Sequence, residues 1–339
     1  MSGLRVVTPG LYTTVQDAGR VGFRNRGVPT SGALDRDAFR LANALVGNDA
    51  DAAVLECLGV GAELEASDGP VRISFIGDAP AATVTREDGT KHALPAGQSA
   101  LLAPGDKVSL GALKSFCAYL AVEGGIDVPS VLGSRSSYVR GGFGGYSGRT
   151  LRNDDFVAVG AAATSRAERR LTRDWRAPDA PIRIVLGPQD DAFTPEGMAT
   201  FLDADYAITT NADRMGFRFE GPKIAHVRGA DIVSDGAVAG SIQVPGSGQP
   251  IVLLADGQSV GGYTKIATVI GADLPALVRR KPGERVRFTA VTQAEAEDIS
   301  RTHEAWLSEV IDGIEDFFDG LDVKALYDRN LVSGVVTAE

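Results

Sequence analysis

The chain has 339 residues, 44% of them hydrophobic, which is enough for two domains with cores of their own. Its formal net charge of -10 argues against a nucleic acid or an anionic membrane as partner. No stretch reaches about 18 uninterrupted apolar residues, and the N-terminus has no apolar signal core, so we expect a cytoplasmic protein. Cys57 and Cys117 both lie in apolar runs, and we expect buried thiols without a disulfide.

Strand signals dominate the first half of the chain. Short apolar or alternating runs are separated by Gly, Pro and Asp turns, and Glu87-Asp88-Gly89-Thr90 is a good hairpin turn. One helix interrupts them at residues 35–46, where apolar residues recur at helical spacing before Gly47. The predicted strands are residues 4–7, 53–57, 71–76, 82–85, 99–103, 107–110 and 116–122.

The second half of the chain follows a segment of different composition. Residues 166–181 are rich in charge, Ala and Pro and are expected to form a solvated linker, or alternatively a surface helix inside one domain. Residues 293–311 are expected to form a helix, and the acidic end, 312–322, to pack loosely or contact a partner. The other predicted elements are strands at 182–186, 251–254, 266–270 and 285–291 and a helix at 195–202.

These signals predict a mainly β fold with a few helices. The expected domains are an N-terminal β domain (1–165), a second β domain (182–292) and a C-terminal helical tail (293–339), with 166–181 as the linker. No P-loop motif occurs, no Gly-x-Gly-x-x-Gly follows a strand, and no Met-Lys-Met marks a biotin attachment site. The three histidines stand far apart without a second ligand at zinc spacing, so no metal site is expected.

Four loops carry sequence that is unusual for a purely structural protein. The first spans residues 13–20 and 27–35 and places small hydroxyl side chains at the start of the predicted helix. Backbone N–H groups at such a position can receive an anion. The alternative is that Ser31 or Asp35 simply caps the helix.

The second loop, residues 135–149, combines many glycines with three arginines. Glycine lets a backbone approach a ligand closely, and the guanidinium groups of Arg135, Arg140 and Arg149 are forked donors suited to carboxylate or phosphate. Ser136 lies beside them. The segment is therefore a candidate binding loop for an anion, and a flexible surface loop is the alternative.

The third and fourth loops contribute the remaining candidates. Asp213 beside Arg214 either orients a substrate amide or forms a structural ion pair. In the fourth loop, Asp256 and Gln258 belong to a polar, Gly-rich turn that leads through Lys265 into an apolar strand. A lysine at such a position is partly desolvated and suited to stabilise an oxyanion, unless its head reaches back to water.

Seven motifs between residues 14 and 270 carry a resemblance that covers about residues 4–291. They are Thr14-Val15-Gln16-Asp17, Gly27-Val28-Pro29 with Ser31-Gly32-Ala33 and Asp35, the segment 135–149, Gly187-Pro188-Gln189-Asp190, Asp213-Arg214-Met215-Gly216, Gly240-Ser241-Ile242-Gln243-Val244-Pro245, and Gly261-Gly262-Tyr263 with residues 265–270. The chain resembles the allophanate hydrolase subunit 2 family, the A/B half of the urea-carboxylase-type biotin-dependent carboxyltransferase domain. Where the family commonly has Ser-Glu-Gly, this chain has Ser234-Asp235-Gly236.

The resemblance implies a fold, partners and an activity. The fold would be two cyclophilin-like β-barrel domains, and the partner a B-type protein of the allophanate hydrolase subunit 1 family, in a heterotetramer. The expected activity is that of the C subunit of a bacterial ATP-dependent 5-oxoprolinase, which hydrolyses 5-oxo-L-proline to L-glutamate together with the A and B subunits, the A subunit being of the lactam-utilisation type. This chain would be inactive alone, and ATP would serve the complex without a P-loop here.

Two alternatives stay open. One is the A/B half of a biotin-dependent carboxyltransferase of the urea amidolyase type, with biotin attached to another chain. The other is a regulatory protein that sequesters its B-type partner. For the enzyme we expect Lys265 and Asp213 to act in catalysis and a common anionic ligand to be held between Lys265 and the segment 135–149. The expected substrate-binding residues are Arg135, Ser136, Arg140, Arg149, Arg214, Asp256 and Gln258.

Overall fold

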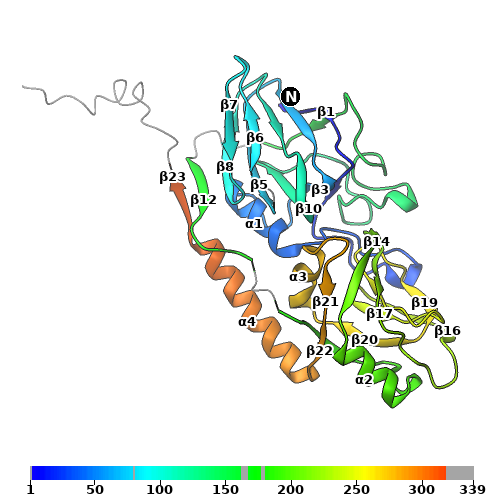
Figure 1. Ribbon diagram of the computed structural model, residues 1–339. Coiled ribbons are helices and arrows are strands. Elements are labelled where there is room, and N and C mark those ends of the chain that lie inside the picture. The colour runs from blue at the N-terminus through cyan, green and yellow to red at the C-terminus, as the bar shows by residue number, and fades with distance from the viewer. Residues whose placement is uncertain (1, 79–80, 162–166, 177–179, 318–339) are drawn as a thin grey trace, which may run out of the picture.

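The computed structural model describes residues 2–78, 81–161, 167–176 and 180–317. Two strand-rich halves lie against each other, and helix α4 runs along the side of both (Figure 1). The first-half elements are β1 (Gly3–Thr8), β2 (Tyr12–Gln16), η1 (Arg24–Arg26), α1 (Arg36–Val46), β3 (Val54–Val60), β4 (Glu63–Ser67), β5 (Val71–Gly77), β6 (Ala82–Thr85), β7 (Lys91–Leu94), β8 (Gln98–Leu102), β9 (Lys107–Ser109), β10 (Ala112–Val122), η2 (Val139–Gly141), β11 (Phe156–Ala158) and β12 (Glu168–Leu171).

The second half follows with a similar density of short strands. Its elements are β13 (Ile182–Leu186), η3 (Asp190–Ala192), α2 (Pro195–Asp203), β14 (Tyr206–Asp213), β15 (Gly216–Glu220), β16 (Asp231–Gly236), β17 (Ser241–Gln243), β18 (Ile251–Leu253), β19 (Val260–Tyr263), β20 (Lys265–Val269), η4 (Gly271–Asp273), α3 (Leu274–Val278), β21 (Arg285–Val286), β22 (Phe288–Ala290), α4 (Gln293–Asp312) and β23 (Ile314–Phe317). The mainly β prediction is confirmed.

A six-stranded and a seven-stranded sheet enclose the apolar core of the first half. Because side chains alternate between the two faces of a strand, Leu55 and Cys57 of β3 point into this core. Their neighbours Val54 and Leu58 pack on the opposite face, in a second cluster that also contains α1. The central strands β3, β5 and β10 of the seven-stranded sheet are thus largely buried on both faces, which explains why they are mostly apolar runs in the sequence.

The second half is built on one eight-stranded sheet that nearly closes on itself. Its order is β21-β14-β15-β18-β17-β20-β13-β22, so the two edge strands are β21 and β22. Only Arg287 separates these two strands along the chain. Both edges of the sheet are therefore held close together, and the sheet curls into a barrel. That the two halves are cyclophilin-like remains a prediction.

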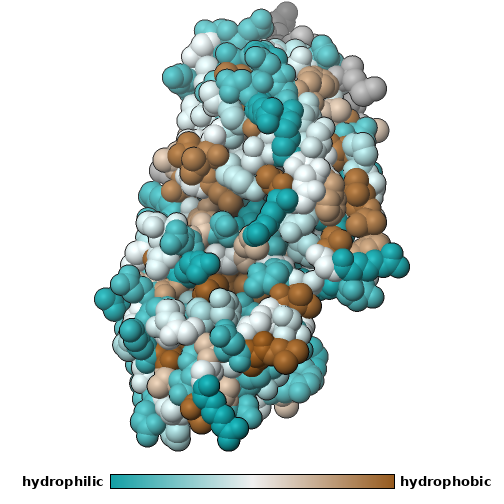
Figure 2. All heavy atoms as spheres, turned by 90° about the vertical axis from the view of Figure 1, so that its right-hand side faces the viewer, coloured by the Kyte–Doolittle hydropathy of each residue, from teal (hydrophilic) through white to brown (hydrophobic). Residues whose placement is uncertain are grey.

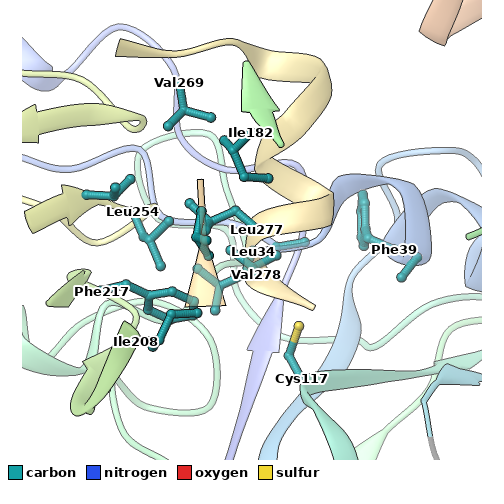
Figure 3. Packing of buried hydrophobic residues seen from close by; sticks show 14 of the residues in the cluster. Leu34, Phe39, Cys117, Ile182, Ile208, Phe217, Leu254, Val269, Leu277 and Val278 are labelled. Carbon is teal, nitrogen blue, oxygen red and sulfur yellow. The ribbon is translucent and has the colours of Figure 1, made fainter. Parts of the chain in front are cut away.

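One hydrophobic cluster continues from the first half into the second. Figure 3 shows Leu34 and Cys117 of the first half near Leu277 and Val278 of α3, with Phe217 of β15 beyond them. A large apolar interface of this kind holds two domains in a fixed relation. Polar side chains that cross this interface between the halves, called the joint below, are consequently held in defined positions.

The ends of α1 explain the first of the four loops. Asp35 is the N-cap residue, and its Oδ1 accepts from the Ala38 N–H at 3.0 Å. The helix ends at Gly47, which has a φ of 70°, a conformation that suits glycine. Capping by Asp35 is therefore the outcome, and Arg279 of the second half also donates to its carboxylate, at 2.6 Å.

Two predicted segments need correction. The expected solvated linker contains β12, which pairs with β8 of the seven-stranded sheet and with β23. The expected helical tail is α4 followed by β23, so the acidic end returns to the first half as an edge strand. Residues 318–322 of that acidic end lie outside the described residues, as does the rest of the tail to residue 339.

Candidate functional site

Lys265 lies in a polar cluster carried by the second-half barrel. Its side chain is 2% exposed, and its Nζ donates to Asp235 Oδ2 at 2.8 Å. The Lys265 backbone N–H donates to Gln189 Oε1 at 3.0 Å, and Gln189 Nε2 donates to the same Asp235 oxygen at 3.2 Å. Lys265 is thus a buried, ion-paired lysine and not a surface lysine that reaches back to water.

The carboxylate partner of Lys265 comes from a separate ribbon. Strands β16 and β19 form a two-stranded sheet of their own, in which Asp235 pairs with Gly261. The hydrogen bond from Lys265, with those from the Gly236 N–H and Gln189, holds the pKa of Asp235 below its ordinary value. Because the Asp235 side chain is 53% exposed, the ion pair is open to solvent on one side. The ammonium itself is buried, and solvent reaches the pair through Asp235.

Two further glutamines complete this cluster. Gln243 of β17 is the cross-strand partner of Lys265 and is only 1% exposed. Its Oε1 accepts from Gln258 Nε2 at 3.2 Å, while its Nε2 is buried without a hydrogen-bond partner in the described structure. A Cβ atom at Gly261 would lie 2.2 Å from that Nε2, so the glycine leaves room for the carboxamide. A buried amide without a partner is costly, which makes Gln243 Nε2 a candidate donor of this cluster.

Arg214 and Asp256 instead form a buried ion network across the joint. Arg214 donates to both Asp256 oxygens, at 2.8 and 3.1 Å, to Glu56 Oε1, and to the Gly32 carbonyl at 2.7 Å. Burial by itself lowers the pKa of Arg214, but the two carboxylates raise it above its ordinary value. Glu56 also accepts from Tyr119 Oη at 2.6 Å. The hydrogen bonds of Arg214 go to the protein itself, which favours a structural role.

A cavity of about 760 Å³ lies between the two halves, beside this network. Arg140 and Asp213 line it, together with Tyr12 and Lys281. Asp213 does not pair with Arg214 but accepts from the Met215 and Gly216 N–H groups, at 2.8 and 3.2 Å. The lining contains four of the predicted site residues, which are Arg140, Asp213, Arg214 and Asp256, whereas Lys265 and Gln258 belong to the other cluster.

The remaining residues of the second loop are engaged within the first half. Arg149 makes a bidentate pair with Asp155, at 2.6 and 2.8 Å. Arg135 donates through Nε to the Val128 carbonyl at 3.0 Å. Ser136 is fully buried, and its Oγ donates to Asp17 and accepts from the Asp17 N–H at 3.0 Å. Of the three arginines, Arg140 lines the cavity between the halves, whereas Arg135 and Arg149 are engaged within the first half, so the single anion site expected from the sequence stays a prediction.

Three residues of the Lys265 cluster were not among the predicted site residues, although the sequence carried a signal for them. Gln189, Asp235 and Gln243 all lie in or beside motifs that support the family resemblance. Residues 257–261, Gly-Gln-Ser-Val-Gly, also have the spacing of a hydrolase nucleophile elbow. That turn leads into strand β19 and not into a helix, so Ser259 lacks the strand-to-helix setting of such a nucleophile.

The described ranges contain no group of three or more His, Cys, Asp or Glu side chains that could hold a metal ion. Within the same ranges, no helix is long and apolar enough to cross a membrane.

Comparison with known proteins identifies the class of the chain. The chain is 36% identical to the C subunit of 5-oxoprolinase from Escherichia coli (strain K12) over 296 residues, which cover 86% of this chain and 93% of that protein. It is 31% identical to urea amidolyase of Lachancea kluyveri, over 91% of this chain and 18% of that protein. The crystal structure of the K. lactis urea amidolyase superposes with a TM-score of 0.80 and 27% identity, over 91% of this chain and 20% of that one.

These similarities define a carboxyltransferase-type domain. The family model described as "Carboxyltransferase domain, subdomain A and B" matches residues 26–290. The chain belongs to this family. One of these relatives is a subunit of an enzyme, and another is a much longer protein of which the chain matches 18%.

Proposed function

We propose that this chain is the C subunit of an ATP-dependent 5-oxoprolinase, which hydrolyses 5-oxo-L-proline to L-glutamate. The observation that carries the proposal is the cluster around Lys265, which combines an ammonium group with the carboxamides of Gln189, Gln243 and Gln258. The similarity to the Escherichia coli protein supports the same conclusion. In the proposed reaction the ring C–N bond breaks, water supplies the new C–O bond, and the nitrogen becomes the amine of glutamate.

The cluster is suited to a cyclic amide, which presents one N–H donor and one carbonyl acceptor. The unpartnered Gln243 Nε2 would donate to the lactam carbonyl oxygen, and Gln258 Oε1 would accept from the ring N–H. Lys265 would stabilise negative charge that develops on that oxygen. A buried donor aimed at developing charge needs little reorganisation during the reaction. Asp213 takes no part in this proposed arrangement, because it lines the cavity between the two halves.

ATP would activate the carbonyl oxygen by phosphorylating it, with ADP leaving in that step and inorganic phosphate leaving after water adds to the carbon. The cluster itself does not suit a triphosphate. The cations nearby, Lys265 and Arg24, already donate to Asp235 and to backbone carbonyls. A triphosphate requires several free cations or backbone N–H groups. We therefore place ATP with the partner subunits, and this chain would hold and orient the amide.

A B-type subunit would cover the open side of the cluster. Figure 2 faces the side of the molecule on which β16 and β19 lie in Figure 1, and brown apolar patches are visible on its lower half. The ribbon carries exposed Val233 and Val260, 93% and 57% exposed, next to half-exposed Asp235. Exposed apolar side chains that surround a polar centre are typical of interaction surfaces. The complex with the A and B subunits, in a heterotetramer, is part of the proposal.

The test is ATP-dependent glutamate release by the three co-purified subunits, with Lys265→Met in this chain. Methionine keeps the buried stem but removes the charge, so we expect release to fall by about 100-fold or more, the usual loss when a preorganised donor is removed. Lys91→Met on exposed β7 is the matched control and should leave the rate unchanged. Release undiminished by Lys265→Met would contradict the proposal.

A biotin-dependent carboxyltransferase half is the second candidate, favoured by the family description and the urea amidolyase relative. The ureido ring of biotin is also cyclic and carries N–H donors and a carbonyl acceptor, so the same glutamines would suit it. The two candidates differ in what drives the reaction. Glutamate release that avidin does not inhibit favours 5-oxoprolinase, whereas carboxyl transfer from carboxybiotin favours the second candidate.

A further inference from the structure

A loop of the first half reaches across the joint to the cluster around Lys265. The loop connects β2 to α1 and contains the short helix η1, and the blue ribbon before α1 extends to the second-half strands in Figure 1. Arg24 of η1 donates through Nη2 to the carbonyl oxygen of Ala237, and to that of Gln258 at 3.3 Å. Both acceptors are backbone groups of the second half.

These two carbonyls belong to the segments that carry the cluster. Ala237 directly follows β16, two residues after Asp235, which pairs with Lys265. Gln258 contacts Gln243 through its side chain. The two segments are also joined to each other, since the Ala237 N–H donates to the Ser259 carbonyl at 3.0 Å. Arg24 therefore hydrogen-bonds to both the segment that carries Asp235 and the segment that carries Gln258.

The surroundings of Arg24 favour a positional role over an ion pair. Arg24 is partly buried, and this burial lowers the pKa of its guanidinium. Within the ranges that the structure describes, no carboxylate forms a salt bridge with it, and its hydrogen bonds go to carbonyl oxygens. Its neighbour Arg26, on the same short helix, is exposed.

We propose that Arg24 is a positioning residue of the Lys265 cluster, through which the first half sets the distance between Asp235 and Gln258. The planar guanidinium presents several donors in a fixed geometry, which suits two carbonyls from different segments. The expected effect on KM rests on the proposed function, whereas the expected effect on amide hydrogen exchange does not. In the kinetic part, Arg24 acts through Asp235 and Gln258 without touching the substrate.

The kinetic experiment uses the complex of all three subunits. Arg24→Ala should raise KM for 5-oxo-L-proline by about 10-fold, the loss expected for a hydrogen bond that involves a charged group, with a smaller effect on kcat. Arg24→Lys offers a compact head with no planar fork and should lie between Arg24→Ala and the wild type. Added guanidinium should partly restore KM in Arg24→Ala. Arg26→Ala is the matched control and should have a wild-type KM.

The structural experiment is amide hydrogen exchange of this chain in the same complex. In Arg24→Ala, protection should fall in residues 235–238 and 257–260, because these segments lose a shared anchor. Protection in β13 and β20 should stay unchanged, which separates a local effect from unfolding. This measurement requires no substrate and remains informative if the complex does not release glutamate.

The outcomes separate the two proposals. Unchanged exchange in both segments shows that Arg24 does not anchor them and overturns the inference. Faster exchange with an unchanged KM in an active complex overturns the positioning role as well. Faster exchange together with a raised KM that guanidinium restores supports it. In a complex with no glutamate release even for the wild type, the proposed function fails, and faster exchange still supports Arg24 as the anchor of the cluster.

Discussion

Arg214→Met tests the ion network that joins the two halves. Arg214 is 3% exposed, and Glu56 and Asp256, its two partners, are similarly buried. Methionine fills much of the volume of the arginine but leaves both carboxylates in the joint without a cation. Breaking a buried ion pair by removing one partner costs about 3–5 kcal/mol, because the remaining charge is uncompensated.

This cost converts into a measurable change of melting temperature. An unfolding entropy of about 2.1 cal/mol/K per residue gives ~0.7 kcal/mol/K for 339 residues. A loss of 3–5 kcal/mol therefore lowers Tm by about 4–7 °C. The assay is calorimetry of the purified chain, and Arg218→Met, at an exposed position on the adjacent strand β15, is the matched control.

A second variant tests whether the two uncompensated carboxylates cause the loss of stability. Adding Glu56→Gln and Asp256→Asn to Arg214→Met removes the uncompensated charges and should recover part of the lost stability, since neutral groups cost less to bury than charges. The reasoning is refuted if Arg214→Met melts no lower than the Arg218→Met control. It is also refuted if the triple variant is less stable than Arg214→Met alone.

Two other predictions concern single contacts. Gly261→Ala places a Cβ about where the Gln243 carboxamide lies, so we expect glutamate release to fall by about 10-fold with little change in Tm. Gly262→Ala is the control and should leave the rate unchanged, because the nearest atom is 3.6 Å from the new Cβ. Equal rates for the two variants would disprove the role of Gln243. His303 Nε2 lies 2.9 Å from Asp37 Oδ1, and this hydrogen bond raises the pKa of His303 despite burial. The stabilisation is fully present below the ordinary pKa of about 6.5 and is lost as pH rises through the folded-state pKa. His303→Gln should therefore lower Tm at pH ~5.5 and have a smaller effect at pH ~8.5, and a pH-independent difference would contradict this.

Of the regular elements that the structure describes, local sequence predicted about half of the strands and three of the four α-helices, because these have a periodic or apolar signal of their own. Helix α1 was expected at residues 35–46 and is found at Arg36–Val46, bounded by the N-cap Asp35 and by Gly47. The hairpin turn at residues 87–90 joins β6 and β7 as expected. Strands β2, β14, β16 and β19 were missed, and so were β4 and β15, although burial alternates regularly along both. Strands β12 and β23 were missed because charged residues fill most of these two short strands, which read Glu-Arg-Arg-Leu and Ile-Glu-Asp-Phe, and leave no clear apolar pattern.

The candidate site was only partly accessible from the sequence. The burial of Lys265 followed from its place at the start of an apolar strand. Its partner Asp235 lies 30 residues away on a ribbon outside the barrel, and nothing local connects the two residues. The grouping of Lys265 with the arginines of residues 135–149 stays a prediction: Arg140 lines the cavity between the halves and Lys265 does not, and nearness to glycine-rich turns does not determine which turns meet.

The sequence by itself determined the mainly β class, the positions of α1 and α4, and membership of a family, because these depend on local periodicity and on motifs in order. The tertiary structure alone decided which polar side chains lie in contact with one another. Glu56 and Arg214 are 158 residues apart and become neighbours only when the joint forms. Alternation along a strand fixes the face on which a side chain lies, whereas the pairing of strands fixes what it meets there.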